Sequence, residues 1–321
     1  MKPKVWAERS LYPTEMARLQ EKVEMITDGT MDNLPGAEAA ILGGNTVVDG
    51  AFLDHAGPQL KLVIRHGIGY NAVDVGACSE RGILAANTPD GPTESTAEHA
   101  VALMLSMTKS TVKCDRRLRQ NQPWTREDTK GLEVFDHVLG VVGFGRIGRR
   151  VTEICVSGLK MKALIFDPFV PDDAELPEGV TKAKDLDELL SNSDVVTIHT
   201  PLMPETEHMI GEKQLRMMKP DAYLVNAARG PVVDEAALIK VLQDGHLAGA
   251  GLDVFDVEPP EADNPLLQME NVVSTPHLAS NTPQGSQRMS KSVVDQILQL
   301  FDGEKPDALL NPDVWPGRAK S

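Results

Sequence analysis

VLGVVGFGRIG, residues 138–148, is the stretch of sequence that decides the fold. Its first five residues form an apolar run that predicts a buried strand, and Gly143, Gly145 and Gly148 follow in the spacing Gly-x-Gly-x-x-Gly. A strand that enters such a turn and leaves it as a helix binds the pyrophosphate of a dinucleotide, because glycines let backbone N–H groups and the helix N-terminus approach it. The stretch therefore predicts a dinucleotide-binding domain.

Apolar runs and amphipathic stretches alternate on the C-terminal side of this turn. Strands are expected at Val138–Val142, Ala163–Phe166, Val195–His199, Tyr223–Asn226, Ala248–Leu252 and Val272–Ser274, with helices from Arg146 and near Asp185–Leu190, Lys213–Met218 and Asp234–Asp244. Short apolar strands separated by helices form a parallel sheet that is covered on both faces. This part of the chain is predicted to be a doubly wound domain.

The N-terminal third alternates in the same way but more weakly, which predicts a smaller α/β domain. Its expected strands are Ala39–Leu42, Leu62–Arg65 and Ile83–Ala86, and a helix is expected from Asp74. Thr93–Arg119 has helical periodicity and is expected to form one connecting helix. Residues 120–136 are expected to form either a surface loop or an arm around a partner subunit. Ser290–Phe301 is expected to be a helix that returns to the first domain.

Length, composition and charge limit the classes of protein. A chain of 321 residues with 41% hydrophobic and 25% charged residues suits two globular domains. It contains no run of about 18 apolar residues and no apolar leader, so a cytoplasmic location is expected. A formal charge of −15 disfavours nucleic acid and membrane as partners. Cys78, Cys114 and Cys155 lack the spacing of metal ligands, so no metal is expected.

Asp167 stands at the end of the expected strand Ala163–Phe166, and from position 143 to position 167 is 24 residues. A carboxylate about 20 residues after the first glycine accepts hydrogen bonds from the adenosine ribose. A carboxylate also repels a 2′-phosphate, so NAD is expected rather than NADP. The alternative is a surface carboxylate that starts the Asp167-Pro168 turn, but residue type, strand-end position and spacing together favour the ribose contact.

Nine short motifs run along nearly the whole chain: HGIGYNAVD (66–74), NTP (87–89), TAEH (96–99), GFGRIG (143–148), HTPL (199–202), NAARG (226–230), GLDVF (251–255), EP (258–259) and TPH (275–277). In this order they resemble the D-isomer-specific 2-hydroxyacid dehydrogenases. The resemblance implies an α/β fold of two doubly wound parallel-sheet domains, Rossmann-like and flavodoxin-like, with a cleft between them. It implies a substrate-binding domain of residues 1–97 and 282–321, an inserted NAD-binding domain of residues 98–281, and a homodimer joined through the NAD-binding domains.

The catalytic residues implied by the resemblance are Arg229, Glu258 and His277. An imidazole can protonate the alkoxide that hydride transfer leaves, and can remove that proton in the reverse reaction. Glu258 lies 19 residues before position 277, and a carboxylate beside the histidine stabilises imidazolium. Arg229 carries a planar guanidinium suited to the substrate carboxylate and carbonyl. The alternative for Arg229 is an exposed surface arginine.

The resemblance also assigns binding residues. The segment His66, Gly67, Ile68 and Gly69 is implied to hold the substrate carboxylate through backbone N–H groups. Asp253 is implied to accept a hydrogen bond from the nicotinamide carboxamide. Further cofactor contacts are implied for Thr96, Arg146, Ile147, Thr200, Pro201, Thr206 and Ala227. Arg65 is either a contact to a substrate anion or a strand-end surface charge, and the sequence leaves both open.

The expected function is NAD-dependent hydride transfer to or from C2 of a small D-2-hydroxy or 2-oxo acid, with glyoxylate or hydroxypyruvate favoured. Relatives that act on phosphoglycerate commonly have an arginine after the strand that corresponds to Ala39–Leu42, where this chain has Gly43-Gly44. D-3-phosphoglycerate dehydrogenase activity is therefore the alternative. A further alternative is an NAD-sensing protein similar to the corepressors of this fold, which keep the same arginine, glutamate and histidine.

Overall fold

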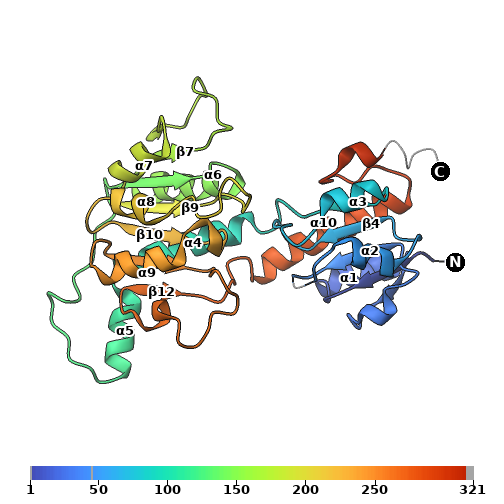
Figure 1. Ribbon diagram of the computed structural model, residues 1–321, viewed down its shortest axis with the longest axis horizontal. Coiled ribbons are helices and arrows are strands. Elements are labelled where there is room, and N and C mark those ends of the chain that lie inside the picture. The colour runs from blue at the N-terminus through green and yellow to red at the C-terminus, as the bar shows by residue number, and fades with distance from the viewer. Residues whose placement is uncertain (1, 45, 316–321) are drawn as a thin grey trace. The chain divides into compact units, whose positions relative to one another are not determined.

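The computed structural model describes residues 2–44 and 46–315 (Figure 1). The chain divides into two compact units: unit 1 comprises Met1–Thr93 and Ser280–Ser321, and unit 2 comprises Glu94–Ala279. Each unit has a parallel sheet covered by helices, so the expectation of two doubly wound α/β domains is confirmed. None of the helices formed by the described residues has the length and apolar character needed to cross a bilayer.

Unit 2 is built on a 7-stranded parallel sheet of order β12-β11-β10-β9-β6-β7-β8. Its strands are β6 (Val138–Val142), β7 (Lys162–Phe166), β8 (Val180–Lys182), β9 (Val195–Ile198), β10 (Tyr223–Asn226), β11 (Gly249–Leu252) and β12 (Val272–Ser274). The chain runs outward from β6 in one direction to β8 and then in the other from β9 to β12. Ligands of such sheets bind beyond the carboxyl ends of the strands at this reversal. Val142 and Ile198, which end β6 and β9, are direct neighbours there.

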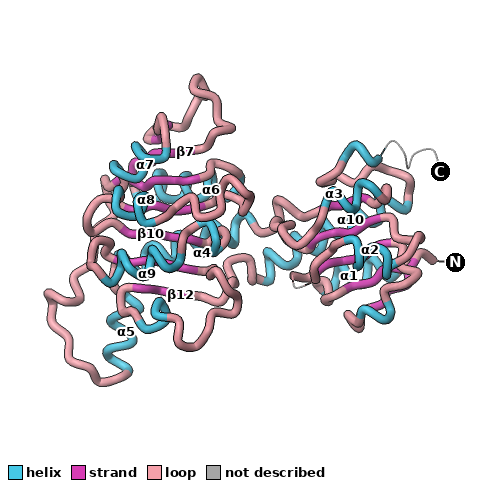
Figure 2. Tube along the Cα trace, viewed as in Figure 1, coloured by secondary structure: helices cyan, strands magenta, loops and turns pink. Residues whose placement is uncertain are grey.

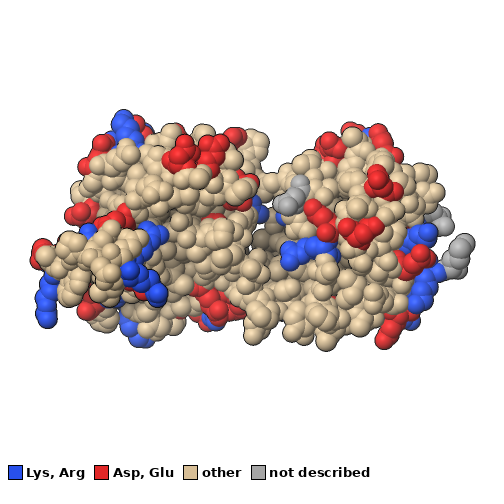
Figure 3. Space-filling view, turned by 90° about the horizontal axis from the view of Figure 1, so that it is seen from below, with Lys and Arg blue, Asp and Glu red and all other residues tan. Residues whose placement is uncertain are grey.

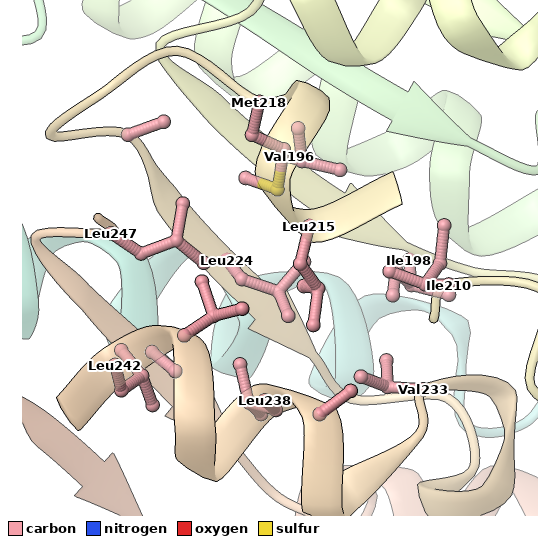
Figure 4. Close-up of a cluster of buried hydrophobic side chains, with 14 of the residues drawn as sticks. Val196, Ile198, Ile210, Leu215, Met218, Leu224, Val233, Leu238, Leu242 and Leu247 are labelled. Atoms are coloured by element: carbon pink, nitrogen blue, oxygen red, sulfur yellow. The ribbon is translucent and has the colours of Figure 1, made fainter. Parts of the chain in front are cut away.

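The helices of unit 2 cover both faces of its sheet (Figure 2). They are α4 (Thr93–Thr108), α5 (Thr111–Arg119), α6 (Arg146–Glu153), α7 (Leu186–Asn192), α8 (Glu212–Met217) and α9 (Glu235–Gln243). Successive strand residues point to opposite faces, so Leu224 joins a cluster with α7, α8 and α9, whereas Val225 joins one with α4 and α6. Figure 4 shows the first cluster, in which Leu224 packs among Leu215, Leu238 and Leu242.

Unit 1 is built on a 5-stranded parallel sheet of order β2-β1-β3-β4-β5. Its strands are β1 (Lys4–Ala7), β2 (Glu24–Ile26), β3 (Ala39–Leu42), β4 (Leu62–Arg65) and β5 (Leu84–Ala86), and its helices are α1 (Pro13–Gln20), α2 (Gly50–Ala56), α3 (Val75–Glu80) and α10 (Pro283–Phe301). The expected return of the last helix is confirmed, because the Ser290 hydroxyl of α10 accepts a hydrogen bond from Tyr12 N at 2.9 Å. The segments that follow β1, β3 and β4 meet at one edge.

The expectation of one helix over Thr93–Arg119 was wrong. Two helices, α4 and α5, occupy this stretch, and Ser110 between them has a left-handed φ of 55°. The buried apolar residues that give α4 its periodicity end at Met107, whereas α5 buries no residue. The periodicity therefore identified the first helix and not its extension.

Acidic and basic side chains stand side by side in several places on the face shown in Figure 3. Arg117 of α5, for example, forms ion pairs with both Asp128 and Glu270.

Candidate active site

The glycine turn after β6 requires its glycines. Gly143 has a φ of +90°, and a Cβ there would lie 2.9 Å from the His199 carbonyl carbon. A Cβ at Gly148 would lie 2.1 Å from the Gly143 oxygen, so only glycine allows α6 to begin this close to β6. A Cβ at Gly145 would meet no atom within 4 Å, so this glycine borders open space at the start of the helix. The turn therefore has the shape that admits a pyrophosphate.

Asp167 is fixed beside this turn. Its Oδ2 accepts a hydrogen bond from Phe144 N at 2.7 Å, and its Oδ1 accepts one from Phe169 N at 2.8 Å. Phe144 is the second residue of the glycine turn, so β7 delivers the carboxylate to the place where the turn meets its ligand. Sequence spacing alone indicated this neighbourhood, and the structure adds the amide that holds the carboxylate in it.

The loop after β9 carries Thr200, whose side-chain hydroxyl can donate a hydrogen bond. Within the described residues, the buried hydroxyl of Thr200 makes no hydrogen bond, and its Cγ2 would lie 3.0 Å from a Cβ at Gly143. Burial lowers the pKa of the adjacent His199 to about 4, so this imidazole is neutral at pH 7. Its Nε2 shares a 2.9 Å hydrogen bond with the Thr197 hydroxyl. A buried hydroxyl beside a glycine cradle fits a polar dinucleotide.

The other residues of unit 2 that are expected to contact the cofactor lie either in loops and helix starts or in buried positions. Thr206 donates a 2.7 Å hydrogen bond from its hydroxyl to Pro201 O, so these two residues close one loop. Thr96 lies buried on α4, and Ala227 lies buried just after β10. Arg146 and Ile147 open α6 directly after Gly145. Thr206, Pro201, Arg146 and Ile147 thus belong to loops or helix starts at the carboxyl edge of the sheet.

His277 and Glu258 form a close pair. His277 Nδ1 lies 2.6 Å from Glu258 Oε2, and Glu258 Oε1 accepts a hydrogen bond from Phe255 N at 3.1 Å. This use of Nδ1 leaves Nε2 as the ring nitrogen that can face a substrate. Burial raises the pKa of Glu258, but the hydrogen bond and charge of His277, the Phe255 amide and the charge of Arg229 outweigh burial and lower it. The glutamate is therefore a charged partner of the histidine.

Arg229 is brought toward this pair by a close approach of two chain segments. Gly230 follows it, and a Cβ on Gly230 would lie 2.0 Å from Phe255 O, so any larger residue would push the segments apart. Asn226 Nδ2 donates to Arg229 O at 2.9 Å and fixes the backbone there. Burial lowers the pKa of Arg229 while the charge of Glu258 opposes the change. A guanidinium stays protonated even so, and its burial strengthens its attraction for an anion.

Asp253 has a structural role that the sequence did not indicate. The residue is 1% exposed, and its Oδ1 accepts hydrogen bonds from the Thr275 hydroxyl at 2.6 Å and from Leu278 N at 2.9 Å. Its Oδ2 accepts one from Ala279 N at 2.9 Å. Burial raises the pKa of Asp253, but these hydrogen bonds and that of His99 outweigh burial and lower it. The carboxylate thus anchors the loop that carries His277, and its expected nicotinamide contact stays a prediction.

Residues 67–69 of the first motif lie in a loop of unit 1, and each of their carbonyl oxygens accepts a hydrogen bond from a neighbouring residue. Gly67 O accepts from Thr88 N at 3.0 Å, Ile68 O from Asn87 Nδ2 at 2.8 Å, and Gly69 O from Arg65 Nε at 3.0 Å. Gly67 N donates to the Thr88 hydroxyl, whereas the N–H groups of Ile68 and Gly69 donate to no acceptor in the part of the chain that the structure describes. Adjacent N–H groups of this kind attract anions. The loop therefore suits a carboxylate at Ile68 and Gly69 but not at Gly67 N.

His66, which precedes this loop, is buried and neutral. Its Nε2 shares a 3.0 Å hydrogen bond with the Ser290 hydroxyl, while its buried Nδ1 has no hydrogen-bond partner within the described residues. Burial lowers the pKa of His66 to about 4, and the charges of Arg9 and Arg65 act in the same direction. No group of three His, Cys, Asp or Glu side chains in the described part of the chain could hold a metal ion.

Comparison with known proteins identifies relatives of the whole chain. The model of the family "D-isomer specific 2-hydroxyacid dehydrogenase, NAD binding domain" matches residues 101–279. A glyoxylate reductase of Korarchaeum cryptofilum is 38% identical over 327 residues, which cover 98% of this chain and 97% of that protein. A D-3-phosphoglycerate dehydrogenase of Archaeoglobus fulgidus is 39% identical and matches 89% of this chain but 53% of its own length, so this chain spans about half of that relative.

A solved structure agrees with these relatives. The D-lactate dehydrogenase of Aquifex aeolicus, complexed with NAD and lactic acid, superposes with a TM-score of 0.82 at 27% identity over 94% of this chain and 96% of that one. The family match over residues 101–279 shows an NAD-binding domain in unit 2, and the glycine turn, Asp167 and the buried Thr200 hydroxyl lie within that domain. The chain belongs to the D-isomer specific 2-hydroxyacid dehydrogenases.

Proposed function

We propose that the protein is an NAD-dependent D-2-hydroxyacid dehydrogenase for small unphosphorylated acids, with glyoxylate or hydroxypyruvate as favoured 2-oxo acids. The observation that carries the proposal is the 2.6 Å hydrogen bond between His277 Nδ1 and Glu258 Oε2 near the charge of Arg229. The similarity to glyoxylate reductases over nearly their whole length supports this choice of substrate.

His277 transfers a proton to or from the substrate oxygen. Bound NAD supplies the nicotinamide ring that gives or takes the hydride at C2. His277 Nε2 donates a proton to the substrate oxygen as it becomes an alkoxide, and it removes the proton from the hydroxyl in the oxidative direction. Glu258 holds the ring through Nδ1 and stabilises the imidazolium that donates.

Arg229 binds and polarises the substrate. Its planar fork can hold the carboxylate through two parallel hydrogen bonds and can place a donor on the 2-oxo oxygen, where negative charge develops. The N–H groups of Ile68 and Gly69 suit a carboxylate, which supports our assignment of unit 1 as the substrate-binding domain.

The cofactor contacts follow from the geometry of unit 2. We assign the pyrophosphate to the turn Gly143–Gly148 and the adenosine ribose to Asp167, and we assign a polar cofactor group to the Thr200 hydroxyl. Contacts from the remaining residues are predictions that rest on the family resemblance: Thr96, Arg146, Ile147, Pro201, Thr206, Ala227 and Asp253.

A panel of 2-oxo acids assayed with NADH tests the proposal. Glyoxylate and hydroxypyruvate should be reduced with higher kcat/KM than pyruvate analogues with bulky side chains or 3-phosphohydroxypyruvate. The glycerate formed from hydroxypyruvate should be the D isomer, whereas the glycolate formed from glyoxylate has no stereocentre. Binding of NADH without turnover of any acid on the panel would instead indicate a binding protein.

Asp167→Ala should relax the choice of cofactor. Wild-type protein is expected to prefer NADH over NADPH by at least about tenfold in kcat/KM, equivalent to about 1.4 kcal/mol, because the Asp167 carboxylate repels the 2′-phosphate. The variant should lose most of this preference, whereas Asp173→Ala, which removes an exposed carboxylate farther along the same loop, should keep it. Equal kcat/KM for both cofactors in wild-type protein would contradict the assignment.

Glu258→Gln should shift the pH profile of reduction. The carboxylate is charged near neutral pH, since its pKa is lowered, and it accepts the hydrogen bond of His277 Nδ1. A carboxylate beside an imidazole stabilises the charged form of the ring, so the pH at which kcat/KM for reduction falls to half should decrease in the variant. Glu261→Gln, at an exposed position nearby, serves as the control. An unchanged midpoint would show that Glu258 does not support the proton donor.

We also propose that the enzyme is a cytoplasmic homodimer without a nucleic-acid partner. Trp124 and Phe135 in the segment 120–136 are 55% and 60% exposed, and such apolar side chains are typical of association surfaces. Cys78, Cys114 and Cys155 are free thiols, which suits a reducing compartment, and the formal charge of −15 disfavours nucleic acid. Light scattering after size exclusion tests the dimer, and a monomeric mass at micromolar concentration would contradict it.

A further inference from the structure

Charged side chains also gather at the carboxyl edge of the sheet in unit 1, beside two glycines. Glu8 and Arg9 follow β1, Gly43 and Gly44 follow β3, and Arg65 ends β4. β1, β3 and β4 are adjacent and parallel, and Leu42 pairs directly with Arg65, so the residues after these strands meet at one place. The catalytic roles proposed above use none of Glu8, Arg9, Gly43 and Gly44.

The Glu8 carboxylate occupies the loop that follows β3. Its Oε2 accepts hydrogen bonds from Gly43 N and, at 3.2 Å, from Gly44 N. Its Oε1 accepts from Thr46 N at 3.1 Å and from the Thr46 hydroxyl at 2.8 Å. Clustered backbone N–H groups directed at one point are a common binding site for phosphate. Here the anion at that point belongs to the protein itself.

Glu8 is ionised in this place. Partial burial raises its pKa, but the hydrogen bonds from the Thr46 hydroxyl and from the amides of Gly43, Gly44 and Thr46 outweigh burial and lower it. A carboxylate that accepts four hydrogen bonds from one short loop also leaves those donors without capacity for another anion.

Two arginines border the same loop. A Cβ at Gly43 would lie 3.0 Å from Arg9 Cδ, and a Cβ at Gly44 would lie 3.8 Å from both Nη atoms of Arg65. Arg65 Nε donates to Gly69 O, so this side chain connects the loop after β3 to the segment that offers the Ile68 and Gly69 amides. Glu8 therefore places one negative charge on the loop that these two positive charges border.

We infer that Glu8 is a specificity-determining residue, which fills the anion site of Gly43, Gly44 and Thr46 with its own carboxylate and excludes substrates with a phosphate on carbon 3. This inference rests on the proposed function. A phosphate dianion beside Arg65 would meet a carboxylate and would find the loop donors already occupied, whereas the neutral hydroxyl of hydroxypyruvate meets no such repulsion.

Steady-state kinetics test the inference with the whole protein. Hydroxypyruvate and 3-phosphohydroxypyruvate are compared as substrates for wild-type protein, Glu8→Ala, Glu8→Gln and the control Glu21→Ala, which removes an exposed carboxylate at the end of α1. Wild-type protein and the control should favour hydroxypyruvate by at least about a hundredfold in kcat/KM. Glu8→Ala should reduce this ratio by about tenfold or more, and Glu8→Gln by a smaller factor, because it removes the charge but keeps an acceptor.

Binding of inorganic phosphate gives a second readout that needs no turnover. With saturating NAD present to occupy the glycine turn after β6, phosphate should raise the Tm of Glu8→Ala and should leave the Tm of wild-type protein and of Glu21→Ala unchanged. Circular dichroism checks that each variant is folded, and Glu8→Gln decides the question if the alanine variant does not fold.

Two outcomes separate this inference from the proposed function. If wild-type protein reduces no 2-oxo acid, the proposed function fails, and phosphate binding by the variants still decides the role of Glu8. If wild-type protein reduces hydroxypyruvate but both Glu8 variants keep its substrate ratio and bind no phosphate, the role of Glu8 is wrong. Phosphate binding of equal strength to wild-type protein and Glu8→Ala would overturn it as well.

Discussion

His277→Ala should lower kcat for reduction of a 2-oxo acid by at least about two orders of magnitude, because the alkoxide then has no positioned proton donor. The dissociation constant of NADH should stay nearly unchanged, since the glycine turn and Asp167 lie in other loops of unit 2. Stopped-flow reduction and fluorescence titration with NADH measure the two quantities. His55→Ala, at an exposed position on α2, is the control.

The backbone of His277 calls for a second variant. Its φ is 51°, a left-handed value that alanine tolerates poorly and asparagine adopts more readily. His277→Asn therefore separates loss of the proton donor from strain in the loop. If the asparagine variant kept kcat within about tenfold of wild type, proton donation by this residue would be disproved.

Arg229→Ala should lower the activity at least as much as His277→Ala does. Loss of the guanidinium removes both a carboxylate contact and a donor to the oxygen that gains charge, and one such donor alone is worth about 10² to 10³ in kcat. We expect kcat/KM to fall by about three orders of magnitude, with contributions from a higher KM and a lower kcat. Arg216→Ala, which removes an exposed arginine of α8, should stay near wild type.

Arg229→Lys tests which property of the arginine matters. Lysine keeps the charge but not the planar fork, so it should restore little of the lost activity. Added guanidinium ion should partly rescue Arg229→Ala if the side chain acts through direct hydrogen bonds to substrate. A lysine variant within about fivefold of wild type would show that charge alone suffices.

The sequence predicted the elements whose signals are local. Val138–Val142, Tyr223–Asn226 and Ala39–Leu42 are strands at the predicted residues, because each is a short and mostly buried apolar run inside a sheet. Lys4–Ala7 and Glu24–Ile26 also form strands but were not predicted. The second of these is an edge strand of three residues that buries none of its side chains fully, so its residues carry little apolar signal.

Contacts between residues that lie far apart in the sequence could not be predicted from local patterns. Glu8 meets Gly43 across 35 positions, and Asp253 meets Ala279 across 26. His99 of the TAEH motif has its Nε2 2.9 Å from the Thr275 hydroxyl, across 176 positions. No periodicity or spacing rule links such pairs, because the fold brings them together only after the strands have been placed side by side.

We infer that the hydrogen bonds of Asp253 affect the entropy of activation. Both carboxylate oxygens bind the loop from Thr275 to Ala279, and His277 N donates to Asp253 O at 2.7 Å, so the backbone of the proposed proton donor has little freedom before substrate arrives. The ordering of this loop takes place during folding, and it does not recur in each catalytic cycle. A preorganised donor of this kind lowers the activation barrier, because neither the loop nor its dipoles must reorganise as the alkoxide forms.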